Sequence, residues 1–445
     1  MPGGEISPGS VTISHRRVVT IALPMMLSHV TTPLLGIVST AVIGRLGSAE
    51  LLGAIALGAV VFDFLFWGFG AFRMATAGLT AQATGAGNRY KVDTILARSF
   101  LIAVTAGILL LILQHPIKLA AGWFYDASPA VTSGMYEYFN IRIWAAPLTL
   151  SNYVILGSIL GRARTDIGLL LQVAINLVNI AFSLLFVLGL DLGIAGVALA
   201  TVLAEAAGVV LGILALRYLG SDPFRVSWRD LADKAELWHM LAVNRDIMIR
   251  TACLLLAFAL FSRQGAQAGD GVLAANAVLY NMYLIGSYFL DGFATAAETL
   301  GGQSVGARNR QAFIQATRLC LIWCIGIGLA VSLGFMVIGP WFIDTVSTNE
   351  DVRALAKSFL FFAAISPFVG SAAFVFDGIF IGATWTAAMR NLMLISLAVF
   401  VAVMLIGTEM GNTGLWCAFL AFLGARGLGQ AYLYPKLTRQ TFGSE

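Results

Sequence analysis

Long apolar runs, each of about 20 residues or more, follow one another along almost the whole chain and are separated by short polar breaks. An apolar helix of about 20 residues crosses a bilayer core. Hydrophobic residues make up 59% and charged residues 11% of the 445 positions, too few charges for a water-exposed surface. We therefore predict membrane-spanning helices, at approximate limits 17–44, 51–78, 94–117, 135–160, 167–188, 193–217, 238–262, 272–302, 313–342, 355–381, 387–407 and 413–435.

A repeat divides these runs into two sets of six. Residues 82–89, Gln-Ala-Thr-Gly-Ala-Gly-Asn-Arg, return 221 positions later at 303–310 as Gln-Ser-Val-Gly-Ala-Arg-Asn-Arg. The ends of a second segment, Gly161 and Thr165, match Gly382 and Thr386 at the same offset. Because each set is even in number, both copies share one orientation. The predicted fold class is an all-α polytopic membrane protein, with twelve transmembrane helices in two six-helix bundles related by a pseudo-twofold axis along the membrane normal.

The longest polar connection predicts the boundary between the halves. It covers about 218–237 and mixes acidic with basic residues. We predict an N-terminal six-helix bundle at 1–220, a cytoplasmic linker at 221–237 and a C-terminal six-helix bundle at 238–445.

Basic residues predict the orientation. The side that holds both termini carries most of the loop Lys and Arg, whereas the opposite loops carry only Arg45, Lys118, Arg263, Arg353 and Lys357. Basic loops stay in the cytoplasm, so both termini are expected there.

Acidic residues inside the second half are the first candidates for function. Asp291 and Glu298 are seven residues apart, on one helix face, and Asp377 lies deep in a later segment. Placing a charged side chain at this depth of the membrane costs about 2.5–3.5 kcal/mol, so such a residue indicates a structural or functional role. A cluster facing a cavity could take up protons or bind a cationic compound. The alternative is a structural ion pair with Arg250 or Arg426.

The first half holds fewer embedded charges. Asp63 is flanked by aromatic residues, an environment that suits a lipophilic cation, although a hydrogen-bonded acid fits equally well. Arg73 and Glu205 are expected to form inter-helix pairs near the cytoplasmic ends.

Two further clusters have structural interpretations. Arg245 and Asp246, together with Arg250, predict a charge network that orients the segment beginning at 238. Cys320 and Cys324 lie one helical turn apart, but no His or carboxylate flanks them, so we expect packing residues and no metal site.

Five stretches, spread in order along the chain, are similar to motifs of one known family: Pro33–Gly44, Arg73–Gln82, Asn244–Arg250, Leu290–Glu298 and Phe376–Thr384. Together they resemble the MATE (multidrug and toxic compound extrusion) transporters, specifically the bacterial branch named for DNA-damage-inducible protein F. The resemblance implies two six-helix bundles, a V-shaped central cavity, alternating access and export of organic cations driven by protons or sodium.

The chain departs from this family at two positions. The resemblance implies an aspartate where Ser39 stands and a second acid where Ser183 stands. A serine does not titrate near neutral pH, so that aspartate's proposed proton mechanism does not carry over. With Asn176, Asn179 and Thr201, these serines are expected to form a neutral polar pocket for substrate or water.

Two functional interpretations follow. In the first, coupling to protons or sodium relies on the second-half acids, with Asp63 as a local substitute, and the chain exports amphipathic, cationic organic compounds by antiport. In the second, it is an uncoupled or specialised exporter or flippase of a lipid-linked, neutral or anionic substrate. The expected partners are a small organic molecule and the lipid bilayer of the bacterial inner membrane, with no nucleic acid, no cofactor and a monomeric chain. The sequence contains no nucleotide-binding Gly-x-x-x-x-Gly-Lys-Ser/Thr, and no enzymatic activity is expected.

Overall fold

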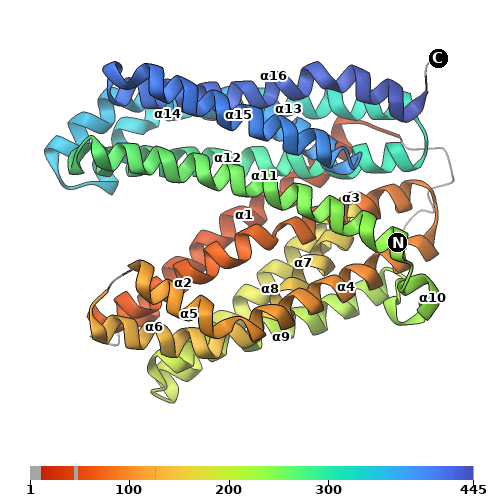
Figure 1. Cartoon of the computed structure of the whole chain (residues 1–445), viewed down its shortest axis with the longest axis horizontal. Coiled ribbons are helices and arrows are strands. Elements are labelled where there is room, and N and C mark those ends of the chain that lie inside the picture. The colour runs from red at the N-terminus through yellow and green to blue at the C-terminus, as the bar shows by residue number, and fades with distance from the viewer. Residues whose placement is uncertain (1–11, 45–48, 126, 444–445) are drawn as a thin grey trace. The chain divides into compact units, whose positions relative to one another are not determined.

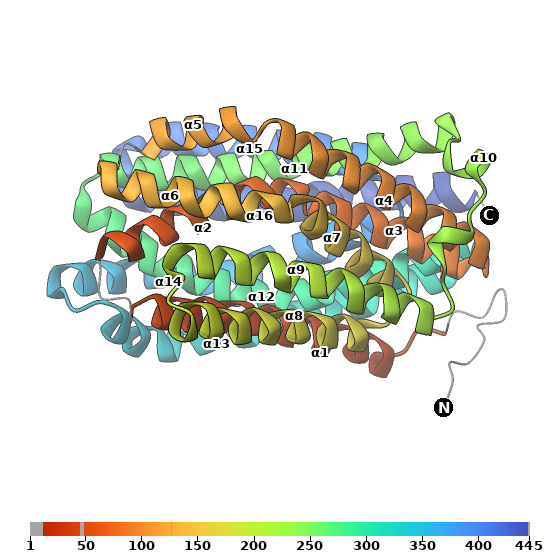
Figure 2. The same cartoon turned by 90° about the horizontal axis from the view of Figure 1, so that it is seen from below.

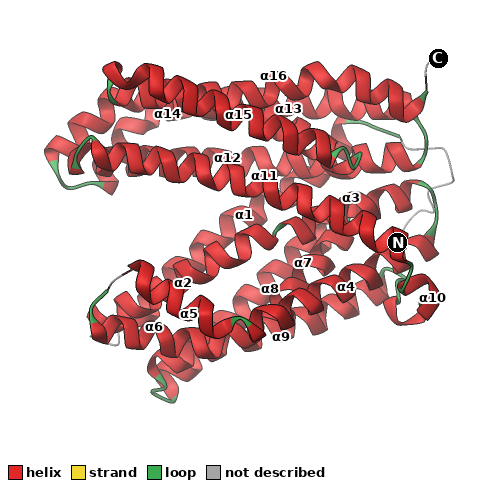
Figure 3. Ribbon diagram, viewed as in Figure 1, coloured by secondary structure: helices red, strands yellow, loops and turns green. Residues whose placement is uncertain are grey.

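The computed structural model describes residues 12–44, 49–125 and 127–443, with only the backbone described at 30–43 and at 49. These residues form helices joined by short turns, and no strand occurs within these ranges (Figure 3). This is the outcome expected of apolar segments that must satisfy their own backbone hydrogen bonds in lipid.

Nine helical stretches in the described ranges are long and apolar enough to cross a membrane. They are Glu50–Gly85, Arg89–Ile112, Pro129–Gly161, Thr165–Gly189, Gly193–Tyr218, Asp270–Gly306, Arg310–Val346, Glu350–Gly382 and Thr386–Met410. The other three predicted segments are helical as well, in α1 (His15–Gly44), α11 (Lys234–Gln267) and α16 (Asn412–Phe442).

The packing divides the chain into two compact units, which we call unit 1 and unit 2. Unit 1 comprises residues up to Met26, Ala81–Gly87 and Ala242–Glu445, and unit 2 comprises Leu27–Thr80 and Asn88–Leu241. The start of α1 and a short segment near Gly85 thus group with the second half of the chain. The predicted domain limits remain a prediction based on sequence.

Unit 2 contains most of the first six segments. Its helices are α2 (Ala49–Phe69), α3 (Ala71–Gly85), α4 (Arg89–Ile112), α5 (Gln114–Tyr125), α6 (Pro129–Arg142), α7 (Ala146–Gly161), α8 (Thr165–Leu184), α9 (Gly193–Tyr218) and α10 (Trp228–Leu231). A 3₁₀ turn joins α6 to α7, and a π turn (Leu185–Gly189) follows α8. Phe62 and Phe139 stack in its core, with centroids 5.2 Å apart.

Unit 1 contains the later helices, α12 (Asp270–Gly306), α13 (Arg310–Val346), α14 (Glu350–Gly382), α15 (Thr386–Ile406) and α16. Within it α12 packs against α13 and α14, and α16 packs against α14 and α15 (Figures 1 and 2). Phe261, Trp416 and Phe419 form an aromatic cluster in its core.

The repeat seen in the sequence is present in the backbone. Asn88 accepts a hydrogen bond at 2.9 Å from the amide three residues on and so caps α4, and Asn309 caps α13 in the same way at 2.9 Å. Ala163 and Thr384, also 221 residues apart, both adopt positive φ, at 60° and 56°. The repeated residues therefore build the same helix ends twice.

The two copies of the repeat also pack against each other within unit 1. A Cβ atom on Gly85 would collide with the backbone of Gln303, and one on Gly306 would collide with the backbone of Gln82. Gly85 and Gly306, and likewise Gln82 and Gln303, are equivalent at the offset of 221. The contact is therefore reciprocal, as at an isologous interface. The Gln82 amide additionally donates to the carbonyl of Gly382 at 2.8 Å.

The polar connection near 221–237 is anchored to unit 2 rather than extended. The Tyr90 hydroxyl and the Ser227 hydroxyl, the latter at 2.7 Å, donate to the Asp230 carboxylate. Arg98 donates to the Asp230 carbonyl at 2.9 Å. The hydrogen bond from Tyr90, and to a smaller extent the one from Ser227, lowers the pKa of the Asp230 carboxyl below its usual value.

Candidate functional site

Asp377 of α14 is the centre of a buried charge cluster in unit 1. Arg250 of α11 and Arg426 of α16 both donate to its Oδ2, Arg426 at 2.6 Å, and Gln430 donates to Oδ1 at 2.6 Å. Only 5% of Asp377 is exposed. A buried carboxylate is tolerated when it is paired and hydrogen-bonded in this way. Two guanidinium groups against one carboxylate hold Asp377 in its ionised form.

A second charge network lies around Asp246 of α11. Arg245 donates to Asp246 Oδ1 at 3.0 Å, and Arg390 of α15 donates to the same oxygen at 2.6 Å. The predicted network thus contains Arg390 in addition, whereas Arg250 belongs to the Asp377 cluster instead.

The other two acids predicted for coupling lie on α12. Glu298 is 4% exposed. It lies at the point where Gly378 and Gly382 allow α14 to pack closely against the backbone of α12. Asp291 is half-buried, and its carboxylate has no hydrogen-bond or ion-pair partner among the residues that the structure describes. Neither acid joins the Asp377 cluster.

Glu205, in the middle of α9, is the corresponding acid of unit 2 and is partly buried. Asn152 of α7 donates to its carboxylate at 2.6 Å, and the Thr149 hydroxyl is a second donor. Arg142 of α6 is close enough for its charge to act on Glu205. Within the described parts of the chain, no Lys or Arg nitrogen lies within 4.0 Å of this carboxylate, so its direct donors are neutral.

Arg142 itself is bound by aromatic groups. It donates to the Tyr138 hydroxyl at 2.7 Å, and its guanidinium carbon lies 4.8 Å from the centroid of Phe62. Asp63 is exposed, and the charge of Arg142 acts on it as well. The inter-helix ion pairs expected of Arg73 and of Glu205 are absent among the described residues, where Nη1 of Arg73 is buried and makes no hydrogen bond.

The neutral pocket residues lie on α8 and α9. Asn179 donates to the Thr201 hydroxyl at 3.2 Å, and Ser183 donates to Asn179 at 3.5 Å. Nδ2 of Asn176 is buried and finds no acceptor among the described residues. The side chain of Ser39 lies outside the described residues. A free amide donor beside a chain of hydroxyls suits a polar, uncharged group of a ligand.

The clusters around Asp377 and Glu205 each include a residue at the same position of the repeat. Arg426 follows Glu205 at the offset of 221, in the helices that close the two halves. The same scaffold position thus carries a base in unit 1 and an acid in unit 2. The chemistry of the halves differs at this point.

Sequence reasoning missed several partners in these clusters, namely Arg142, Thr149, Asn152, Arg390 and Gln430. Gln430 could have been found, because it lies four residues after Arg426 and therefore on the same helix face. Asn152 is a polar residue inside an apolar segment, and such residues often bond across helices. Within the described ranges, no group of three or more His, Cys, Asp or Glu residues is placed to hold a metal ion.

A helical membrane fold in two units, each with charged groups buried among its helices, defines a polytopic membrane transporter. The chain belongs to the MatE family, whose family model matches residues 24–185 and again residues 247–406. The two matches end 221 residues apart, which is the offset of the repeat.

Relatives in sequence and structure agree with this assignment. The chain is 36% identical to DNA damage-inducible protein F of Escherichia coli (strain K12), over 96% of this chain and 93% of that protein. It is 24% identical to Protein DETOXIFICATION 44, chloroplastic, of Arabidopsis thaliana, over 92% of this chain and 80% of that protein. A crystal structure of MATE in the bent conformation superposes with a TM-score of 0.88 at 18% identity, covering 96% of this chain and 97% of the other. This chain is thus a multidrug and toxin extrusion transporter with the twelve-helix, two-bundle fold of that family.

Proposed function

We propose that the chain is a proton-coupled antiporter of the bacterial inner membrane, exporting amphipathic organic cations by alternating access as a monomer with cytoplasmic termini. The observation that carries the proposal concerns two embedded acids, Asp291 and Glu205, which no arginine of the described residues contacts within ion-pair distance. Asp291 has no partner in the described structure, and Glu205 has only neutral donors. An acid of this kind is costly when charged in the membrane, so proton binding is favourable.

Asp377 differs from the other acids predicted for coupling. Its contacts with Arg250 and Arg426 support the structural alternative, because protonation would leave two buried guanidinium groups without their counter-charge. We therefore assign proton coupling to Asp291 in unit 1 and to Glu205 in unit 2, and a positioning role to Asp377. Glu298 stays a predicted coupling residue because it lies on the same face of α12 as Asp291.

Substrate recognition is assigned to unit 2. Asp63 is exposed close to Phe64 and Trp67, which are also exposed, and this combination of carboxylate and aromatic faces suits a lipophilic cation. Asn179 and Thr201 supply neutral hydrogen-bonding groups in addition.

Efflux of an amphipathic cation such as ethidium from everted vesicles, under an imposed pH or sodium gradient, tests the proposal. We expect a pH gradient to drive transport, and Asp291→Asn and Glu205→Gln each to lower it tenfold or more, a typical effect of losing a proton-transfer group. Asp166→Asn, which removes an exposed acid paired with Arg164, is the matched control and should retain transport.

Transport driven by sodium alone would contradict proton coupling. Wild-type pH-driven transport in both Asp291→Asn and Glu205→Gln would contradict the assignment of these acids. Export of neutral or anionic probes in preference to ethidium would contradict the substrate class and favour the specialised exporter.

A further inference from the structure

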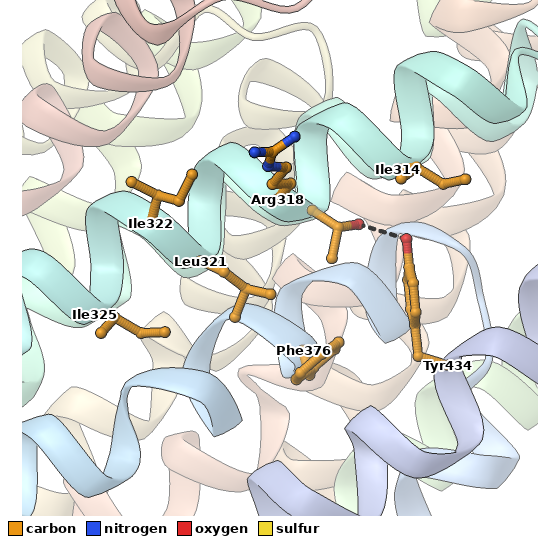
Figure 4. A pocket seen from close by; sticks show the side chains of 8 residues that line it. Ile314, Arg318, Leu321, Ile322, Ile325, Phe376 and Tyr434 are labelled. Atoms are coloured by element: carbon orange, nitrogen blue, oxygen red, sulfur yellow. Dashed lines mark hydrogen bonds between the residues drawn. The ribbon is translucent and has the colours of Figure 1, made fainter.

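An open groove lies at the surface of unit 1, between α13, α14 and α16. Its volume is about 590 Å³. The groove is lined by Ile314, Arg318, Leu321, Ile322 and Ile325 of α13, Phe376 of α14 and Tyr434 of α16. In Figure 4, Leu321 and Ile325 lie on the side of α13 towards Phe376, whereas Arg318 and Ile322 point to its other side, at the rim of the groove. A volume of this size accommodates a ligand of a few dozen atoms.

The α13 residues that line the groove belong to an exposed stripe of this helix. On another face, the Trp323 indole donates to His15 at 3.1 Å and the Gln315 amide donates to the Ile13 carbonyl at 3.1 Å. Residues 314, 318, 322, 325 and 329 form one helical stripe, and every one of them is exposed, Ile322 by 50%. An exposed aliphatic stripe on a membrane helix faces lipid chains.

The groove carries a single charge. Arg318 is the one ionised residue in its lining, and no carboxylate in the described part of the chain lies within ion-pair distance of it. The Tyr434 hydroxyl, which donates to Thr317 at 3.1 Å, is a second polar group in the lining. A planar guanidinium with free donors is suited to a phosphate oxygen.

The repeat provides an internal comparison. At the offset of 221, Ala97, Ile155 and Ile213 of unit 2 stand where Arg318, Phe376 and Tyr434 stand in unit 1. The aliphatic stripe persists, because Leu101 and Val104 of α4 are exposed like Ile322 and Ile325. Both halves thus offer an apolar outer face, but only unit 1 adds a cation and a phenol to it.

We propose that this groove binds one anionic phospholipid, with its phosphate on Arg318 and an acyl chain along the stripe of α13. The predicted orientation puts the Arg310 end of α13 in the cytoplasm, where basic pockets between membrane helices bind anionic head groups. The site is distinct from the buried acids, and its occupancy does not depend on the coupling ion or on the exported compound.

Native mass spectrometry of the purified full-length chain, titrated with phosphatidylglycerol or phosphatidylcholine, tests this site. We expect one phosphatidylglycerol molecule to be retained in preference to phosphatidylcholine. Arg318→Gln should weaken phosphatidylglycerol binding about fivefold, towards the level of phosphatidylcholine, as expected for one basic group near a membrane surface. Arg318→Lys should keep the preference, and Lys436→Gln, which removes an exposed charge of α16 outside the groove, should leave binding unchanged.

Equal retention of the two lipids, or equal phosphatidylglycerol binding by wild type and Arg318→Gln, would overturn the proposal. Displacement of the lipid by millimolar inorganic phosphate would overturn it too, since the site would then be one for a free anion. Ile322→Trp offers an independent check if Arg318→Gln does not fold. By filling the groove without altering charge, it should reduce retention of phosphatidylglycerol, and undiminished retention would count against the site.

Discussion

Asp377 in unit 1 and Glu205 in unit 2 are both acids embedded in a membrane helix, yet their surroundings are opposite. Two guanidinium groups and an amide bind Asp377, whereas an amide and a hydroxyl bind Glu205. Arg426, which neutralises Asp377, occupies the repeat position of Glu205 itself. The two halves thus share one scaffold but differ in chemistry. One half holds an acid paired with arginines, and the other holds an acid that no cation contacts directly among the described residues.

The largest expected effect comes from breaking the ion cluster of unit 1. Arg426→Gln leaves buried Asp377 with one guanidinium in place of two, and loss of a buried charge partner costs about 3–5 kcal/mol. Glu205→Gln removes the acid itself and keeps a group that can hydrogen-bond, so we expect it to cost less than about 1 kcal/mol.

Thermal unfolding of both variants in the same detergent measures this difference, with Arg439→Gln as an exposed control. Equal losses of stability in Arg426→Gln and Glu205→Gln would show that the two acids are equivalent after all.

A smaller effect is expected where the halves remain alike. Gly85→Ala and Gly306→Ala each place a methyl group against the backbone of the opposite copy of the repeat, which cannot move aside as a side chain can. Such overpacking costs about 1–3 kcal/mol. Denaturation should show similar losses for the two variants, and Gly326→Ala, where the added Cβ meets open space, is the control. Unequal losses of stability would show that the two copies of the repeat contribute differently to the contact.

The helix caps test the same symmetry at a finer level. Asn88→Ala and Asn309→Ala each remove an N-cap acceptor, at a cost of about 1 kcal/mol apiece. Because the two caps act on different helices and share no hydrogen-bond partner, their effects should add in the double variant. A combined loss well below the sum of the two single losses would indicate that the caps are coupled.

The smallest effect concerns an acid outside the membrane segments, Asp230. Hydrogen bonds from Tyr90 and Ser227 place its folded pKa below the unfolded value of about 3.9. Its contribution is therefore complete above that unfolded pKa and disappears as pH falls through the lower folded pKa. Hydrogen exchange of residues 222–233, corrected for the intrinsic pH dependence, should show protection falling in that acidic range.

Asp230→Asn should abolish this acid-dependent step, and Asp233→Asn should retain it. An unchanged step in Asp230→Asn would assign the transition to another group.

Apolar runs predicted the helices well, because length and hydropathy are local properties. The repeat likewise predicted paired helix ends, since Asn88 and Asn309 act within three residues of themselves. The break between α2 and α3 at Gly70 and the π turn after α8 were not predicted, because apolar composition does not encode local hydrogen-bond register.

The partners of the acids were harder to predict. Arg250 lies 127 residues from Asp377, so their contact depends on how whole helices pack. The sequence alone left two roles for Asp377, coupling or an ion pair, and it predicted an inter-helix ion pair for Glu205. Packing instead brings Asn152 to Glu205. Charge complementarity alone does not decide between donors on different helices.

The reciprocal contact of Gly85 with Gln303 and of Gly306 with Gln82 also has an evolutionary meaning. A chain of half this length that paired with a second copy of itself about a twofold axis would show the same contact twice, residue for residue. The fused protein retains that pattern inside one compact unit. The repeat contact thus has the form of a dimer interface within one chain. The glutamine and glycine that make it are the same in both copies, whereas positions 205 and 426 differ in charge.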